Sequence, residues 1–145
     1  MAAMQATMER VMGLDESILA GLRASFSGVL IGPEDEAYEQ ARHVYNAMID
    51  RYPRLIARCA DIADVIAVVD FARNNELLLA VRGGGHNGAG FGVCDDGVVL
   101  DLSLMNGIRV DPNAQTIRAE GGCTQGAVIH AGGAFGADGL RVGID

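Results

Sequence analysis

Cysteine is scarce in this sequence, and its number and spacing argue against a disulfide-rich protein. The three cysteines, Cys59, Cys94 and Cys123, lie far apart and form no C-x-x-C pair. An odd number of widely spaced cysteines disfavours a disulfide framework, and reduced cysteines are usual in the cytoplasm. Residues 1–9 also lack the apolar core of a signal peptide. The sequence therefore predicts a cytoplasmic protein.

Long apolar runs and an excess of basic residues are missing as well. No run approaches the roughly 18 apolar residues that a membrane-spanning helix needs. The 11 basic residues stand against 19 acidic ones, which gives a net charge of -8. Such a charge argues against nucleic acid and against anionic membrane surfaces. We expect neither as a partner, and no pattern of residues predicts a metal site.

Proline is rare, with 3 residues against 20 glycines in a chain of 145 residues. The length is typical of one domain with a sizeable core, and half of the residues are hydrophobic, which makes disorder improbable. The excess of glycine is high for an α/β domain. It indicates a ligand surface that is lined by backbone.

The glycines concentrate in one stretch, which follows the apolar run 77–81. The run is short and sharply bounded, as expected of a buried strand. The stretch then reads Arg82, Gly83, Gly84, Gly85, His86, Asn87, Gly88, Ala89, Gly90. Glycine lets the backbone turn through positive φ, and consecutive bare N–H groups form concave sites that suit phosphate. We therefore expect residues 82–90 to bind an anionic ligand, and a simple nucleotide-phosphate binder is one reading of this loop.

Residues 83–88 also satisfy the G-x-G-x-x-G pattern, and Asp101 lies at about the distance of a ribose-binding acid. That fingerprint requires a helix directly after its last glycine. Here residues 89–92 and the turn signal 95–97 follow instead. The dinucleotide-binding reading is therefore rejected.

Hydrophobic periodicity and capping residues predict an α/β chain. The expected helices cover residues 15–26, 33–50, 61–74 and 124–135, and the expected strands cover 28–32, 54–59, 77–81, 98–102, 108–111 and 116–120. The expected buried stripe of the third helix is Ile62, Val65, Ile66 and Val69, widened by Phe71 and Ala72. That of the last helix is Val128, Ile129 and Ala131. The tail, residues 136–145, is Gly-rich and is assigned to none of these elements.

The succession of strand 54–59, helix 61–74 and strand 77–81 is a βαβ unit, so its two strands should be parallel. The glycine stretch then leaves the carboxyl end of the second strand. Open α/β sheets bind ligands at that edge. Residues 108–111 and 116–120 flank a Pro-Asn turn and should form a hairpin.

Several of these stretches resemble one family. Residues 55–73 look like the opening of an FAD-binding domain, and residues 81–90 match its pyrophosphate-binding loop almost letter for letter. Residues 99–105, 110–112 and 119–123 fit as well. The resemblance is to the para-cresol methylhydroxylase type (PCMH-type) of FAD-binding domain, in the branch that is similar to berberine bridge enzyme and related to vanillyl-alcohol oxidase.

The resemblance implies a flavin oxidoreductase, often an oxidase that returns electrons to O₂, with FAD as cofactor. His86 stands where the family's histidine bonds covalently to the flavin 8α-methyl carbon. Arg82 and the amides of residues 83–87 (Gly83, Gly84, Gly85, His86, Asn87) would hold the pyrophosphate, and Gly88, Ala89 and Gly90 would complete the loop. Cys123 is expected to be structural, and His43 and His130 to lie at the surface.

The implied fold class is α+β (α/β): a βαβ unit plus a hairpin that form the first lobe of the PCMH-type domain, with N-terminal helices. Residues 1–50 would be a helical lead-in and residues 51–145 that first lobe. Family members continue with a second lobe and a substrate domain, so the chain is expected to be truncated, and its catalytic residues are unknown. A small-molecule substrate would bind only if the missing domain were supplied. The alternative is a non-catalytic α/β module that lacks bound flavin and acts with a partner lobe or not at all.

Overall fold

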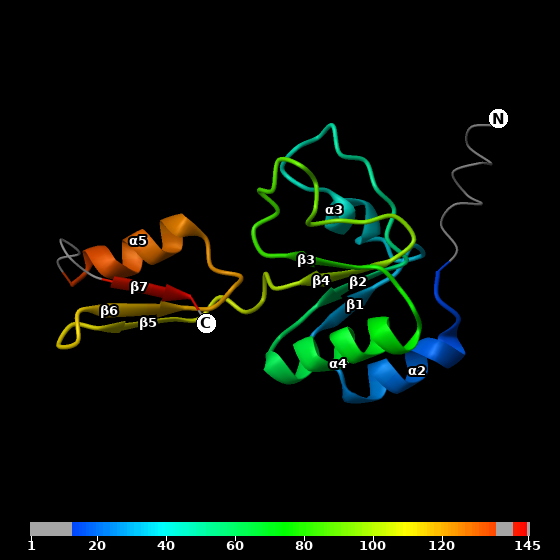
Figure 1. The fold of residues 1–145 in the computed structure, drawn as a ribbon, viewed down its shortest axis with the longest axis horizontal. Helices are drawn as coiled ribbons and strands as arrows, with labels where there is room; N and C mark the ends of the chain where they lie inside the picture. The colour runs from blue at the N-terminus through cyan, green and yellow to red at the C-terminus, as the bar shows by residue number, and fades with distance from the viewer. Residues whose placement is uncertain (1–12, 136–140, 145) are drawn as a thin grey trace.

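The computed structural model describes residues 13–135 and 141–144. It contains two β-sheets, and each has its own helices (Figure 1). The first 12 residues of the expected lead-in and the greater part of the tail, residues 136–140 and 145, lie outside the described residues.

The larger sheet carries the predicted βαβ unit. Its strands are β1 (Val29–Ile31), β2 (Leu55–Arg58), β3 (Leu79–Arg82) and β4 (Val98–Asp101), in the order β1-β2-β4-β3. β2, β3 and β4 are parallel, while β1 pairs antiparallel with β2. The predicted parallel arrangement of β2 and β3 is confirmed, with β4 inserted between them. Mixed α/β architecture, the predicted fold class, is therefore confirmed.

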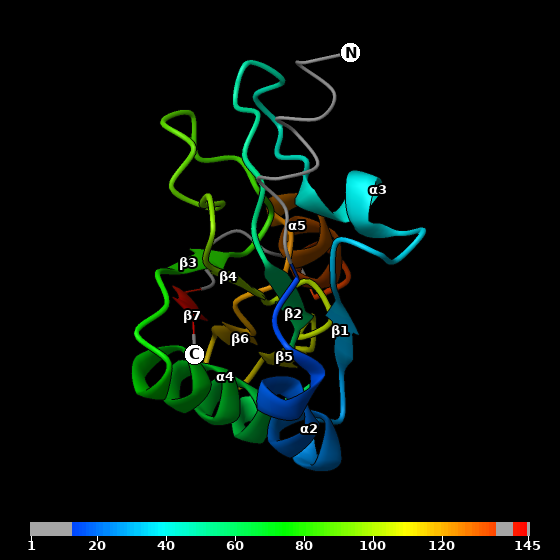
Figure 2. The same cartoon turned by 90° about the vertical axis from the view of Figure 1, so that its right-hand side faces the viewer.

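Two helices cover one face of this sheet and one short helix lies on the other (Figures 1 and 2). α2 (Glu16–Ser25) and α4 (Ile62–Asn74) share a face, and α3 (Tyr38–Arg42) lies opposite. The side chains of Asp15 and Asp61 accept backbone N–H bonds at the first turns of α2 and α4, as their acceptor chemistry predicts. The core between α2, α4 and the sheet is built from buried aliphatic side chains, chiefly Leu19, Leu22, Leu55, Val68, Val98 and Leu100.

The predicted buried face of α4 is wrong in its first two turns. Ile62 and Ile66 are 69% and 57% exposed, and Asp64 and Val68 are buried instead, whereas Phe71 and Ala72 are buried as predicted. Both stripes keep helical spacing, so apolar periodicity alone does not choose between them. Asp64 makes the choice, because its carboxylate turns inward and accepts hydrogen bonds from the N–H groups of Ser27, Gly28 and Ala60 at 2.8–2.9 Å.

The helix predicted over residues 33–50 is also wrong, since α3 spans only Tyr38–Arg42. Before it, the Asp35 carboxylate accepts the N–H of Gly32 at 2.7 Å and closes a local turn. After it, the N–H of Tyr45 donates to the carbonyl of Gly85 at 3.0 Å instead of to the preceding helical turn. Tertiary contacts with the glycine stretch thus replace the helix that local periodicity predicts.

The smaller sheet contains the predicted hairpin. β5 (Ile108–Asp111) pairs antiparallel with β6 (Thr116–Ala119), and β7 (Arg141–Ile144) adds parallel to β6. The hairpin is confirmed, and β7 is a strand to which the sequence analysis assigned no element.

α5 (Gln125–Gly133) packs on the hairpin. The side chain of Thr124 caps it by accepting the N–H of Ala127 at 3.2 Å. The predicted buried side is wrong for Ile129, which is 63% exposed. The helix turns half-buried Val128 and buried Gly132 toward the sheet, one turn apart, and this rotation points Ile129 outward.

Candidate functional site

The three parallel strands end on charged residues that lie side by side. Asp101, at the end of β4, is in register with Arg58 of β2 on one side and with Arg82 of β3 on the other. The Arg82 guanidinium donates from Nη2 to Asp101 Oδ2 at 2.7 Å, and Nε of Arg58 lies 3.5 Å from the same oxygen. The carboxyl edge of the sheet therefore carries two cations around one carboxylate.

Asp101 stays ionised in this position. Burial by itself would raise its pKa, but the hydrogen bond from Arg82 and the N–H of Ser103, at 2.8 Å, outweigh burial and hold the pKa of Asp101 below its usual value. The site thus contains a buried, charge-assisted pair at the base of the glycine stretch.

Arg82 uses its guanidinium within the protein. Besides Asp101, its Nη2 donates to the carbonyl of Ala41 at 2.7 Å, and its Nη1 donates to that of His43 at 3.4 Å. Its side chain is only 6% exposed. Arg82 therefore ties the ends of β3 and β4 to the end of α3.

The glycine loop, residues 83–92, follows Arg82 directly. Gly85 and Gly90 adopt φ of 71° and 79°, in the left-handed region that favours glycine. At Gly83, an added Cβ would lie 2.8 Å from the carbonyl oxygen of Gly121, so a side chain there would push the loop away from the start of α5. The loop is therefore shaped by backbone approaches that larger residues would prevent.

The backbone N–H groups of residues 83–88 donate no hydrogen bond to any other group in the part of the chain that the structure describes. Runs of such N–H groups bind anions in many proteins. This run is the feature of the loop that is best suited to a phosphate group.

A hollow of about 580 Å³ lies beside these amides. Four segments line it: the end of α3 with residues 43–45, the strand ends, residues 83–85 of the glycine loop, and the start of α5. The start of a helix carries a partial positive charge and free N–H groups. The hollow thus combines three features that attract anions: the N–H groups of the glycine loop, the arginines at the strand ends and the start of α5. It does so although the chain as a whole is acidic.

The predicted site residues fall into two groups. Arg82, Gly83, Gly84 and Gly85 line the hollow. His86 and Gly88 lie further along the loop, both exposed. The interactions of the His86 ring are with Tyr45, whose ring centroid is 5.0 Å away.

Asn87 and Gly90 shape the far end of the loop. The Asn87 side chain accepts the N–H groups of Ala89 and Phe91 at 3.1 and 3.2 Å, and buried Gly90 lies against Ile49. Their assignment to cofactor binding stays a prediction.

Sequence reasoning missed several residues at this site. Arg58 lines the hollow, and its Nε is buried without a hydrogen-bond partner among the described residues. The sequence could have identified Arg58, because it ends a predicted parallel strand, and ligands bind at that edge of the sheet. Tyr45 and Asn46 contact the glycine loop across a long sequence separation, and no local pattern predicts that. Cys123 also lines the hollow, and its Sγ lies 3.3 Å from the carbonyl oxygen of Gly107.

Over residues 13–135 and 141–144, no cluster of three or more His, Cys, Asp or Glu could hold a metal ion. Within the same ranges, none of the helices combines the length and the apolar character that crossing a bilayer requires.

Relatives of the chain share its fold and sequence. It is 37% identical over 112 residues to (R)-6-hydroxynicotine oxidase of Paenarthrobacter nicotinovorans, which covers 77% of this chain and 24% of that protein. It is 35% identical over 103 residues to the FAD-linked oxidoreductase hasG of Aspergillus fumigatus, covering 70% and 22%. The crystal structure of 6-hydroxy-D-nicotine oxidase from Arthrobacter nicotinovorans superposes with a TM-score of 0.76 at 37% identity, covering 77% and 25%.

The chain spans about a quarter of the length of these relatives. Residues 53–139 match the family described as the FAD binding domain. The match includes the βαβ unit, the glycine loop and the hairpin, and the relatives are FAD-linked oxidoreductases. The chain therefore belongs to the FAD binding domain family, in its PCMH-type, berberine-bridge-like branch, and FAD is the cofactor of this domain.

Proposed function

We propose that this chain is the flavin-binding portion of a berberine-bridge-like FAD-linked oxidoreductase, with the FAD pyrophosphate on the glycine loop and a covalent flavin link at His86. The observation that carries the proposal is the run of N–H groups at residues 83–88, which have no acceptor among the described residues and begin beside the hollow. Pyrophosphate needs several donors at close range, and a glycine backbone supplies them without steric hindrance.

The charges around the hollow fit the same ligand. Arg58 is half-buried and lines the hollow, and its Nε contacts the Asp101 carboxylate at 3.5 Å. Its two Nη groups donate no hydrogen bond to the described residues, so they can donate to an anion. Arg82 already donates hydrogen bonds from Nη2 to the carbonyl of Ala41 and to the carboxylate of Asp101. We therefore assign the direct cationic contact to Arg58, and to Arg82 the positioning of the loop.

FAD, when bound, supplies the two-electron redox chemistry of the whole enzyme. The chain's own contribution is to bind and orient it: the amides and Arg58 hold the anionic centre, and the start of α5 adds its dipole. His86 would supply the imidazole nitrogen for the covalent bond to the flavin 8α carbon and would give up its N–H proton. The two electrons and two protons released in total would pass to dioxygen.

A second candidate is a non-catalytic module that lacks flavin and acts only with a partner lobe. The observation that favours it is a largely apolar hollow of about 440 Å³ beside α5, bordered by Val128 and the exposed side chain of Ile129. A surface of this kind is typical of contact with another chain or domain. In this candidate function, a small-molecule substrate would bind only with residues that the other chain or domain supplies.

The test is the visible absorption spectrum of the full chain, incubated with FAD in air, before and after acid precipitation. Flavin absorbance that stays with the pellet supports the covalent link, and His86→Ala should release it. His130→Ala, an exposed histidine on α5, is the matched control and should retain the flavin. Acid-stable flavin in His86→Ala would contradict the assignment. A folded chain that takes up no flavin favours the second candidate.

A further inference from the structure

The glycine loop is held from outside by a second segment. We call residues 43–50 the bracing segment. The N–H of Tyr45 donates to the carbonyl of Gly85 at 3.0 Å, and Nδ2 of Asn46 donates to that of Gly88 at 3.1 Å. Both views of the ribbon show the two segments on the same side of the larger sheet, the side on which α3 lies (Figures 1 and 2).

The bracing segment is itself anchored to the fold. Arg42, just before it, is 7% exposed, donates to the carboxylates of Glu39 and Asp50, and lies over the ring of Tyr52 at 4.1 Å. Arg82 donates to the carbonyl of His43 at 3.4 Å from the other side. The segment therefore begins and ends at fixed points, and it can hold the loop in place.

Tyr45 contacts the side chain that matters most for the proposed function. Its ring centroid lies 5.0 Å from that of His86, with the planes tilted by 40°. The His86 imidazole makes no hydrogen bond with any other described residue, so the ring contact is what restricts its rotamer. The imidazole also lies close to Gly84, where an added Cβ would come within 2.9 Å of Cδ2.

Apart from this ring contact, the side chain of Tyr45 contributes little to the packing of the fold. It is 78% exposed, and its hydroxyl makes no hydrogen bond within the described part of the chain. An exposed aromatic ring on a reactive histidine serves orientation better than stability, since most of its surface stays in water.

We propose that Tyr45 is a positioning residue that holds the His86 imidazole in the orientation required for bond formation to the flavin 8α carbon. The proposal rests on the proposed covalent role of His86. In that step, the new C–N bond replaces one N–H and one C–H bond, and dioxygen takes up the two electrons and two protons. Orientation of the attacking group governs such a step, and misplacement by about 1 Å can cost about a hundredfold in rate.

The test follows the rate of covalent attachment in the full chain mixed with excess FAD in air. Acid-stable flavin fluorescence is recorded over time, and total bound flavin is measured by absorbance. We expect Tyr45→Phe, which keeps the ring, to attach flavin as fast as the parent chain. Tyr45→Ala should attach it about tenfold or more slowly while it binds the same total amount.

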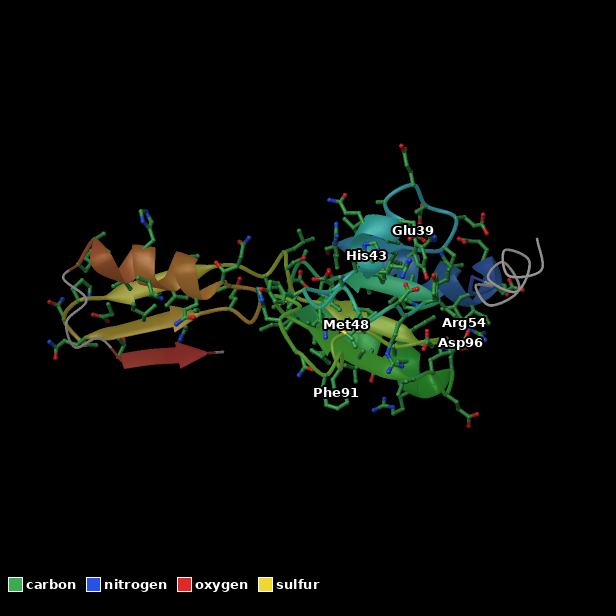
Figure 3. The ribbon with its side chains drawn as sticks, turned by 90° about the horizontal axis from the view of Figure 1, so that it is seen from above. Glu39, His43, Met48, Arg54, Phe91 and Asp96 are labelled. Atoms are coloured by element: carbon green, nitrogen blue, oxygen red, sulfur yellow. The ribbon has the colours of Figure 1, made fainter. Side chains whose placement is uncertain are left out.

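Met48→Ala is the matched control. Met48 belongs to the same segment and is 89% exposed (Figure 3), so its loss should leave the attachment rate unchanged. Parent-like attachment in Tyr45→Ala would overturn the inference and leave the role of His86 intact. Equal slowing in Met48→Ala would overturn it as well, because the effect would then belong to the segment as a whole.

A second measurement is independent of flavin. The chain has three histidines, so the ring protons of His86 can be assigned in NMR spectra by comparison with His86→Ala. The Tyr45 ring current should shift these protons in the parent chain and in Tyr45→Phe, but not in Tyr45→Ala. Unchanged shifts in Tyr45→Ala would overturn the proposed positioning. Absence of acid-stable flavin in the parent chain, with these shifts as expected, would instead count against the covalent role of His86.

Discussion

Arg82 and Asp101 form a buried ion pair between adjacent parallel strands, with Nη2 and Oδ2 2.7 Å apart and both side chains at most 6% exposed. Both residues end their strands, and the glycine loop leaves directly from Arg82. The pair therefore fixes the point from which the loop starts.

Removing Arg82 should strongly destabilise the fold, because buried Asp101 keeps only the longer 3.5 Å contact with Arg58 and the carbonyl of Ala41 loses its donor. We expect Arg82→Met to lower the free energy of unfolding by about 3–5 kcal/mol, measured by urea denaturation. The matched control is the exposed pair Arg73–Asp70, at 2.6 Å, where Arg73→Met should cost less than about 1 kcal/mol. Equal costs at the two pairs would show that burial does not govern the effect.

The pH dependence of stability should reveal the same pair. The pKa of Asp101 is lower in the folded chain than its ordinary value of 3.8. Its ionised form therefore stabilises the fold above about pH 4, and this contribution is lost as the pH falls through the folded-state pKa. The difference in unfolding free energy between the parent chain and Asp101→Asn should shrink below about pH 4. A difference that stays constant from neutral to acid pH would rule out this linkage.

Two glycines of the loop should respond differently to the same substitution. Gly90 has φ of 79°, and a Cβ there would lie 2.9 Å from Ile49, so Gly90→Ala should cost about 2–4 kcal/mol of unfolding free energy. Gly88 has no atom within 4 Å of an added Cβ, and Gly88→Ala should change stability by less than about 0.5 kcal/mol. Thermal unfolding of the two variants provides the comparison, and similar melting temperatures would contradict it.

Arg58 should contribute to FAD affinity. Loss of a charge-assisted contact is worth about 1.5–3 kcal/mol, so Arg58→Met should weaken FAD binding about tenfold to a hundredfold in a fluorescence titration. Arg54→Met is the control. Arg54 pairs with Asp96 at 3.7 Å, on the side of the larger sheet away from the smaller one (Figure 3). Equal losses in both variants would remove Arg58 from the site.

Local signals in the sequence were sufficient for much of the secondary structure. Capping aspartates marked the starts of α2 and α4, and the Pro-Asn turn marked the β5–β6 hairpin. These features depend on residues a few positions apart, which the sequence displays directly. The lack of a helix after Gly90 likewise excluded the dinucleotide-binding motif, and the described chain continues there as loop up to β4.

Long-range contacts decided where the sequence misled. The inward turn of the Asp64 carboxylate selected the buried face of α4, and its partners lie in two other segments. The contact of Tyr45 with Gly85 ended α3 early. In each case the local pattern was compatible with both outcomes, the buried face of α4 or the length of α3. Only the contact with a distant segment decided between them.

The sequence by itself determined the α/β succession of strands and helices and the glycine loop that follows a strand of the βαβ unit, because these are local properties, and its resemblance to a known family implied FAD. Only the tertiary structure decided which side chains surround that loop. Strand register brought Arg58 and Arg82 to Asp101, and the path of residues 43–50 brought Tyr45 to His86. Register and path depend on packing between segments distant in the sequence, and no local pattern records them.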